Sequence, residues 1–123
     1  MRGRTMEDPW MPPKHNPLNL NPLQLKTLTL LQALAILPDA KPGEAEGSVL
    51  LTGLPDPHGD HFHLGDAVVA AKDATGLRNP AVWAALERKG LVKTQFPQSA
   101  TLLAAGRDYD TGLKDAILHH SAH

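Results

Sequence analysis

The apolar residues of this chain gather in short blocks that are separated by prolines, glycines and charged residues. The longest block covers residues 23–37, where leucines dominate and a few polar residues interrupt the run. Asn21 is placed to cap a helix, Pro22 suits the first helical position, and Gln24 lies three residues after the cap. The pattern therefore predicts a helix over 22–37, ending before the next proline.

The apolar residues of this predicted helix surround most of its circumference. At 100° per residue, its leucines form no single stripe, so the helix requires burial on more than one side. One small domain covers one side. We therefore expect Leu28 and Leu31 to contact a second copy of the chain or a larger protein partner. The alternative is that the Pro-rich N-terminal segment covers the second side.

The pattern after the first helix predicts a β-hairpin. Residues 48–52 and 61–64 are short apolar segments typical of strands, and the segment 55–60 between them is rich in turn-forming residues.

The second half of the chain predicts three further helices and a second pair of strands. Asp66 and Asn79 are expected to cap the first two of these helices, and Gly76 and Gly90 to end them. The helices are expected at residues 67–74, 80–89 and from about 104 towards 119, and the strands at residues 91–93 and 100–103.

The expected organisation is an arm, a domain and a short tail. Residues 1–20 contain several prolines, which remove backbone donors and disfavour helix, so this arm is expected to be extended. Residues 21–119 are expected to form a single domain, and residues 120–123 a C-terminal tail. Trp10 lies within the arm and is a candidate for docking on the domain or on a partner.

Composition limits the function classes. The 123 residues include 12 Lys+Arg and 13 Asp+Glu, so the formal net charge of -1 lacks the positive excess common in nucleic-acid binders. Residues 66–107 are nevertheless locally basic, whereas residues 38–60 are acidic. The chain has no cysteine, which excludes disulfides and thiolate zinc sites and fits a reducing cytoplasm. The N-terminus lacks the apolar core of a signal peptide, so we expect a cytoplasmic protein without a membrane segment.

Two segments resemble the winged-helix superfamily, and MarR-type regulators in particular. They are Leu-Glu-Arg-Lys-Gly-Leu-Val at 86–92 and Thr-Leu-Leu-Ala-Ala-Gly-Arg at 101–107. The resemblance implies a recognition helix followed by two wing strands, and a dimeric transcription regulator that binds duplex DNA. The expected fold is α+β, a winged-helix-like domain with an extra N-terminal β-hairpin and a Pro-rich N-terminal arm. The candidate DNA-contacting residues are Arg78, Asn79, Arg88, Lys89 and Lys93.

The predicted recognition helix is poor in side chains that reach base edges. Its outward residues are expected to be Ala81, Trp83, Ala84, Glu87 and Arg88, and few of these form hydrogen bonds to bases. The alternative function is therefore a winged-helix protein-interaction module or a small accessory subunit of a larger complex. The candidate partner-binding residues are Trp10, Leu28, Leu31 and Trp83. For Trp83 the sequence favours the alternative of a core residue over an exposed anchor.

A histidine cluster supports a second alternative, a metal-binding domain. His61 and His63 alternate along the predicted strand and so share a face, while His58 and Asp60 lie in the adjacent turn. Imidazole and carboxylate ligands suit a divalent transition metal such as zinc. An exposed hairpin also accommodates these residues without any metal.

Nothing in the sequence indicates catalysis. The serines lack the glycine setting of a nucleophile elbow, no glycine-rich phosphate loop is present, and no carboxylates are paired in a recognisable way. We therefore expect a protein that is not an enzyme and that needs no cofactor.

Overall fold

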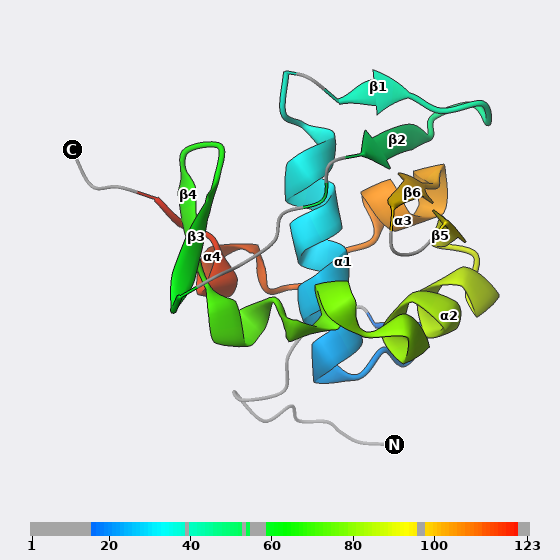
Figure 1. Cartoon of the computed structure of the whole chain (residues 1–123). Helices are drawn as coiled ribbons and strands as arrows, with labels where there is room; N and C mark the ends of the chain where they lie inside the picture. The colour runs from blue at the N-terminus through cyan, green and yellow to red at the C-terminus, as the bar shows by residue number, and fades with distance from the viewer. Residues whose placement is uncertain (1–15, 39, 53, 55–58, 96–97, 121–123) are drawn as a thin grey trace, which may run out of the picture.

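The computed structural model describes residues 16–38, 40–52, 54, 59–95 and 98–120 of the chain. It confirms a mixed α+β protein, built around one central helix with a sheet on either side (Figure 1). The elements in chain order are α1 (Pro22–Ala35), β1 (Lys41–Pro42), β2 (Val49–Thr52), β3 (His61–Leu64), β4 (Ala67–Ala70), the 3₁₀ helices η1 (Ala71–Asp73) and η2 (Thr75–Arg78), α2 (Pro80–Arg88), β5 (Val92–Gln95), β6 (Ser99–Leu102), α3 (Ala104–Asp108), α4 (Lys114–Ile117) and β7 (His119–His120).

The central helix α1 begins as predicted. The Asn21 side chain accepts a hydrogen bond from the Gln24 backbone N–H at 2.8 Å, and the Gln24 side chain accepts one from the Asn21 backbone N–H at 3.0 Å. This reciprocal pair forms a capping box that satisfies two otherwise unpaired donors. The helix ends at Ala35, two residues earlier than predicted.

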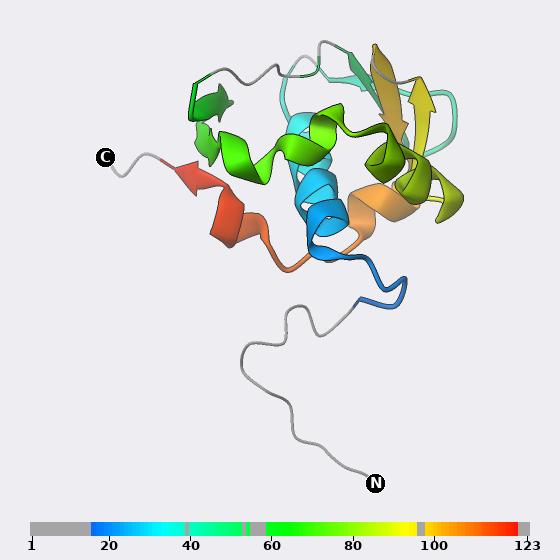
Figure 2. The same cartoon turned by 60° about the horizontal axis from the view of Figure 1, so that its bottom comes forward.

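The chain itself covers α1 on several sides. Leu28, Leu30 and Leu31 are fully buried, and the helix contacts α2, α3, η2, β2 and β6. In two views, α2, β5 and β6 lie to one side of α1, and β3, β4 and α4 lie to the other (Figures 1 and 2). The expectation that one small domain covers only one side of this helix is therefore wrong.

The larger sheet has the antiparallel order β1-β2-β6-β5. The hairpin β5–β6 confirms the second predicted strand pair, with Val92 opposite Leu102. The predicted hairpin between residues 48–52 and 61–64 is wrong. Instead, β2 pairs with β6, placing Val49 opposite Leu102, and also with the short strand β1.

The second sheet has the order β3-β4-β7 and replaces a predicted helix. Ala67–Ala70 is a strand, with Ala67 and Val69 buried and Val68 half-buried, because β-branched residues favour a pleated surface. Asp66 consequently lies in the β3–β4 turn beside Gly65, whose φ is +62°, and caps no helix. Only the end of the predicted segment is helical, as the 3₁₀ helix η1.

The helix α2 confirms the third predicted helix. Asn79 caps it by accepting a hydrogen bond from the Ala81 backbone N–H at 2.9 Å. Gly76 does not end the preceding helix but lies within η2. At this position η2 packs closely on α1, and a Cβ would lie 1.9 Å from Thr27 Oγ1.

The predicted last helix is broken into two short helices and a strand. α3 ends at Asp108, the chain is extended at Tyr109, and α4 begins at Lys114. Between them, Asp110 accepts a hydrogen bond from the backbone N–H of Gly112 at 3.1 Å, and Gly112 has a φ of +72°. This turn interrupts the helix. His119–His120 then forms β7 against β4, so the segment around residue 119 belongs to a sheet.

The folded unit begins before the predicted boundary at residue 21. Leu20 is buried, and the Tyr109 hydroxyl joins Asn16 to the backbone N–H of Leu18. Part of the predicted arm, from residue 16 to residue 20, therefore packs on the domain. No helix in the described part of the chain has both the length and the apolar content to cross a bilayer.

Candidate functional site

The outward face of α2 carries few polar groups. Its exposed residues are Pro80, Ala81, Ala84, Glu87 and Arg88, which at 100° per residue lie on one side of the helix. Only Glu87 and Arg88 offer polar side chains. The exposed face of α2 is therefore largely apolar and about 13 Å long.

Trp83 does not belong to this face: of its two expected positions, an exposed anchor and a core residue, the structure shows the core. Its indole is 1% exposed, and its Nε1–H donates a hydrogen bond to the Leu77 carbonyl oxygen at 3.1 Å. The amphipathic indole is thus fully satisfied within the core, where it joins α2 to η2.

The structure brings four of the five predicted DNA-contacting residues to the two ends of α2. Arg78 and Asn79 lie at its N-terminal end, and Arg88 and Lys89 at its C-terminal end. The Lys89 ammonium donates a hydrogen bond to the Leu18 carbonyl oxygen at 2.9 Å, so it turns towards the N-terminal segment.

Lys93, the fifth predicted contact, lies on a different surface. Val92 is buried whereas Lys93 is exposed, so Lys93 projects from the outer face of β5. There it lines a hollow of about 450 Å³ together with Thr101 and the acidic Glu44. The predicted set is therefore split between α2 and the outside of the sheet.

Charge is unevenly distributed along the chain. In the segment 71–102, which contains α2, β5 and β6, there are five Lys and Arg and two acidic residues, one of which, Asp73, is paired with Lys26 at 2.9 Å. The remaining described residues carry four Lys and Arg and seven acidic residues. The basic residues of the first segment are Lys72, Arg78, Arg88, Lys89 and Lys93; the acidic residues outside it are Glu44, Glu46, Asp60, Asp66, Asp108, Asp110 and Asp115.

The residues predicted to bind a protein partner are mostly inaccessible. Leu28, Leu31 and Trp83 are at most 1% exposed in the core, so none of them offers a surface to a second molecule. Trp10 lies outside the described residues. Among the described residues, Ile36 is the large hydrophobic side chain that remains exposed, at 75%.

The structure places three members of the predicted metal cluster at the start of β3. His61 and His63 share an exposed face as predicted, with ring centroids 5.5 Å apart, and His61 Nδ1 lies 2.9 Å from Asp60 Oδ1. The hydrogen bond from the His61 ring lowers the pKa of the Asp60 carboxyl. His58 lies outside the described residues, and among those described no three histidine or carboxylate groups converge on a possible metal position.

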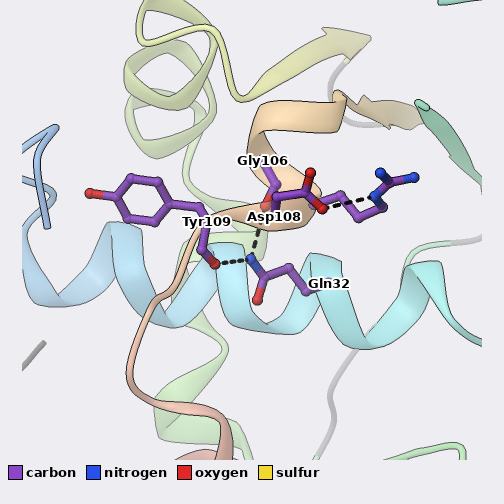
Figure 3. A network of polar contacts seen from close by, with 5 residues as sticks. Gln32, Gly106, Asp108 and Tyr109 are labelled. Atoms are coloured by element: carbon purple, nitrogen blue, oxygen red, sulfur yellow. Dashed lines mark hydrogen bonds and ion pairs between the residues drawn. The ribbon is translucent and has the colours of Figure 1, made fainter. Parts of the chain in front are cut away.

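The sequence does not predict one half-buried polar site, which is formed by Gln32. Gln32, which interrupts the leucine-rich block, donates hydrogen bonds from Nε2 to the carbonyl oxygens of Gly106 at 2.8 Å and Tyr109 at 2.7 Å (Figure 3). It thereby ties the end of α3 to α1. The same side chain lines a cavity of about 540 Å³. The sequence signal for this site is Gln32 itself, a polar residue within the leucine-rich block 23–37.

Comparison of the chain with protein families, with curated proteins and with solved structures finds no significant match.

Proposed function

We propose that the chain is a winged-helix-like protein of MarR type that binds duplex DNA through its phosphates, as a regulator with low sequence preference. The observation that carries this proposal is the placement of Arg78, Arg88 and Lys89 at the two ends of α2, beside its open face. A basic surface on a protein of near-neutral net charge attracts a polyanion locally even though the molecule as a whole does not.

The arrangement of elements supports the same proposal. In the larger sheet, β2 pairs with β6, and β6 pairs with β5. The strands β5 and β6 are the two strands of the candidate wing. α2 packs against α1, η2 and β5, with one face left open to solvent. The major groove of B-DNA is about 12 Å wide, comparable to the length of α2, so basic residues at both ends of this helix are spaced to reach phosphates on both walls.

The composition of α2 supports low specificity. Phosphate contacts fix orientation, whereas sequence is recognised by side chains that hydrogen-bond to base edges. Ala81 and Ala84 occupy the middle of the open face and offer no such groups. Arg78, Arg88 and Lys89 then contribute phosphate contacts at the two ends of the helix.

A salt titration tests the proposal. With about three phosphate contacts, affinity for a fluorescently labelled 20-base-pair duplex should fall about 40-fold between 50 and 200 mM salt. Arg88→Ala should weaken binding to all duplexes and reduce the salt dependence by about one released counterion. Lys114→Ala, on α4, is the control and should bind normally. A chain that binds no duplex at 50 mM salt, or an Arg88→Ala variant that binds as the native chain does, contradicts the proposal.

A protein partner or a second copy of the chain is the second candidate function, supported by the exposure of Ile36. Ile36 borders an apolar hollow together with Leu37 and Leu64, and an apolar patch rimmed by polar residues can mark a protein interface. Light scattering at increasing concentration should then show a dimer that Ile36→Glu abolishes. A chain that stays monomeric, and that pulls down the same proteins with or without this substitution, rejects a partner at this position.

A further inference from the structure

The cavity beside Gln32 has the size of a small-molecule site. Its volume of about 540 Å³ lies within the range of about 300–1,000 Å³ that is common for ligand pockets. It lies among the C-terminal half of α1, the β3–β4 turn, α3 and α4. In Figure 1, β3, β4 and α4 are on the opposite side of α1 from α2, so this cavity is separate from the proposed DNA surface.

The walls of the cavity are mainly apolar. Ile36 at the end of α1 is exposed there although it is a large hydrophobic residue, and an apolar ligand would cover it. The other apolar walls come from α1 and the residues just after it, from β3, from β4 and from the end of α4. The apolar lining residues besides Ile36 are Ala33, Leu37, Pro38, Leu64, Ala67 and Leu118.

Gln32 provides an acceptor in this apolar setting. Both of its amide hydrogens are directed to the carbonyl oxygens of Gly106 and Tyr109, which fixes the orientation of the carboxamide. Its Oε1 atom points away from α3 and accepts no hydrogen bond from any described residue (Figure 3). A half-buried carbonyl oxygen of this kind is available to a hydroxyl or N–H donor.

Two cations and one carboxylate line the opening. Arg107 projects from the end of α3 and Lys114 from the start of α4, whereas Asp66 lies in the β3–β4 turn. Arg107 Nε also lies 3.2 Å from Asp108 Oδ1, but Lys114 forms no ion pair with any described residue. Because Asp108 pairs with Arg107, Lys114 is the cation that complements a ligand with one anionic end.

We propose that this cavity binds a small amphipathic carboxylate, with its apolar body against Ile36 and Leu37 and its carboxylate against Lys114 and Arg107. Polar atoms on the ligand body reach Gln32 Oε1. The cavity is built rather than incidental, because Gly65 brings the β3–β4 turn against α1. Gly65 has a φ of +62°, which favours glycine, and a Cβ there would lie 2.7 Å from Leu37 Cδ2, so another residue would require the Leu37 side chain to move.

The test compares three probes that share a ten-carbon chain. Decanoate, decan-1-ol and decylamine are titrated into the full-length ¹⁵N-labelled chain, and amide shifts are followed by NMR. Decanoate should bind at least about tenfold more tightly than decan-1-ol, and decylamine most weakly, because the carboxylate gains charge-assisted hydrogen bonds. The shifted amides should include those of Gln32, Gly65 and Leu118.

Substitutions of exposed residues then test the contribution of charge to binding without destabilising the fold. Lys114→Ala should reduce the preference for decanoate over decan-1-ol about tenfold, while Lys93→Ala, on β5, leaves it unchanged. Ile36→Glu should weaken decanoate and strengthen decylamine, and Ile36→Lys should do the reverse. A protein interface at Ile36 would instead be disrupted by both substitutions alike.

Three results overturn the proposal. Equal affinities for decanoate and decan-1-ol would show that Lys114 and Arg107 do not bind the carboxylate. Saturation without shifts at Gln32, Gly65 or Leu118 would place the ligand elsewhere. A dimer that covers these same amides and excludes decanoate would make a second copy of the chain the occupant. None of these results depends on DNA binding, which is measured on a different surface.

Discussion

The hydroxyl oxygens of Thr29 and Thr111 lie 2.6 Å apart, although the two residues are 82 positions apart in the sequence. Both side chains are almost fully buried, and Thr29 also bonds to the Leu25 carbonyl oxygen at 2.8 Å. This contact joins the middle of α1 to the connection between α3 and α4. It fixes where the C-terminal segment turns back towards the β3-β4-β7 sheet.

The isosteric substitution Thr111→Val should lower the free energy of unfolding by about 1–2 kcal/mol. It removes the hydroxyl that faces Thr29 and that accepts from the Leu113 backbone N–H at 3.3 Å, and the remaining buried polar atoms lose their partner. Urea denaturation measures the change. Thr52→Val, at an exposed strand position, is the control and should change stability by less than about 0.5 kcal/mol. Equal effects of the two substitutions would contradict the role of the buried pair.

Three glycine-to-alanine substitutions should rank by the space each site offers. Gly90 has a φ of +78° with nothing within 4 Å of a built Cβ, so its substitution should cost only backbone strain of about 1 kcal/mol. Gly65 adds a 2.7 Å approach to Leu37 and should cost more. Gly106 should cost most, because a Cβ there would lie 2.3 Å from the backbone oxygen of Leu91. Thermal unfolding gives the order, and a Gly106→Ala variant as stable as Gly90→Ala would refute it.

Adding Leu37→Ala separates steric conflict from strain at Gly65. If the clash with the Leu37 methyl group is the main cost, Gly65→Ala should be less destabilising in the Leu37→Ala background than in the native one. A purely additive double-mutant cycle would leave backbone strain as the sole cause.

Leu28→Asp should unfold the chain rather than detach it from a partner. Leu28 is fully buried among elements on several sides of α1, so an unpaired carboxylate there should cost several kcal/mol, a large part of the stability of a domain of this size. Circular dichroism should show loss of cooperative unfolding at 25 °C. Ile36→Glu on the same helix segment, but exposed, should leave the melting transition nearly unchanged. A folded Leu28→Asp chain would mean that this part of α1 is not core.

The carboxyl of Asp60 should titrate at a lower pH than an ordinary aspartate. The His61 ring donates to the carboxylate and stabilises its ionised form, which lowers the Asp60 pKa. With the folded pKa depressed, the associated interaction is present above the ordinary aspartate pKa and is lost as the pH falls through the lowered value. Carbon-detected NMR titration should show His61→Ala returning the Asp60 pKa towards the ordinary range, whereas His63→Ala should leave it in place.

Local chemistry explains which elements the sequence predicts well. The capping box of Asn21 and Gln24 and the cap of Asn79 act within four residues, so the start of each helix is decided by neighbours in the chain. Likewise, the β5–β6 hairpin follows from two apolar segments joined by a short turn.

Other elements depended on contacts that the sequence does not display. Residues 67–70 form a short apolar run that does not separate a strand from a helix, and their pairing with β3 and β7 decides for the strand. The segment 104–119 has helical composition, but Gln32 binds the Gly106 and Tyr109 carbonyl oxygens, and the turn at Asp110–Gly112 then interrupts the helix. Trp83 lies near the boundary of the helix face, where packing decides that its indole enters the core.

The positions of α1 and α2, the hairpin after α2 and the local excess of basic residues in the second half follow from the amino-acid sequence alone. Three features follow from the folded chain: the strand that pairs with β2, the burial of the α1 leucines by the chain itself, and the meeting of Gln32, Arg107 and Lys114 around one cavity. The difference lies in the distance along the chain over which each interaction acts. Caps, turns and helical propensity act over a few residues, whereas the burial of α1 and the lining of the cavity join residues that are tens of positions apart in the chain.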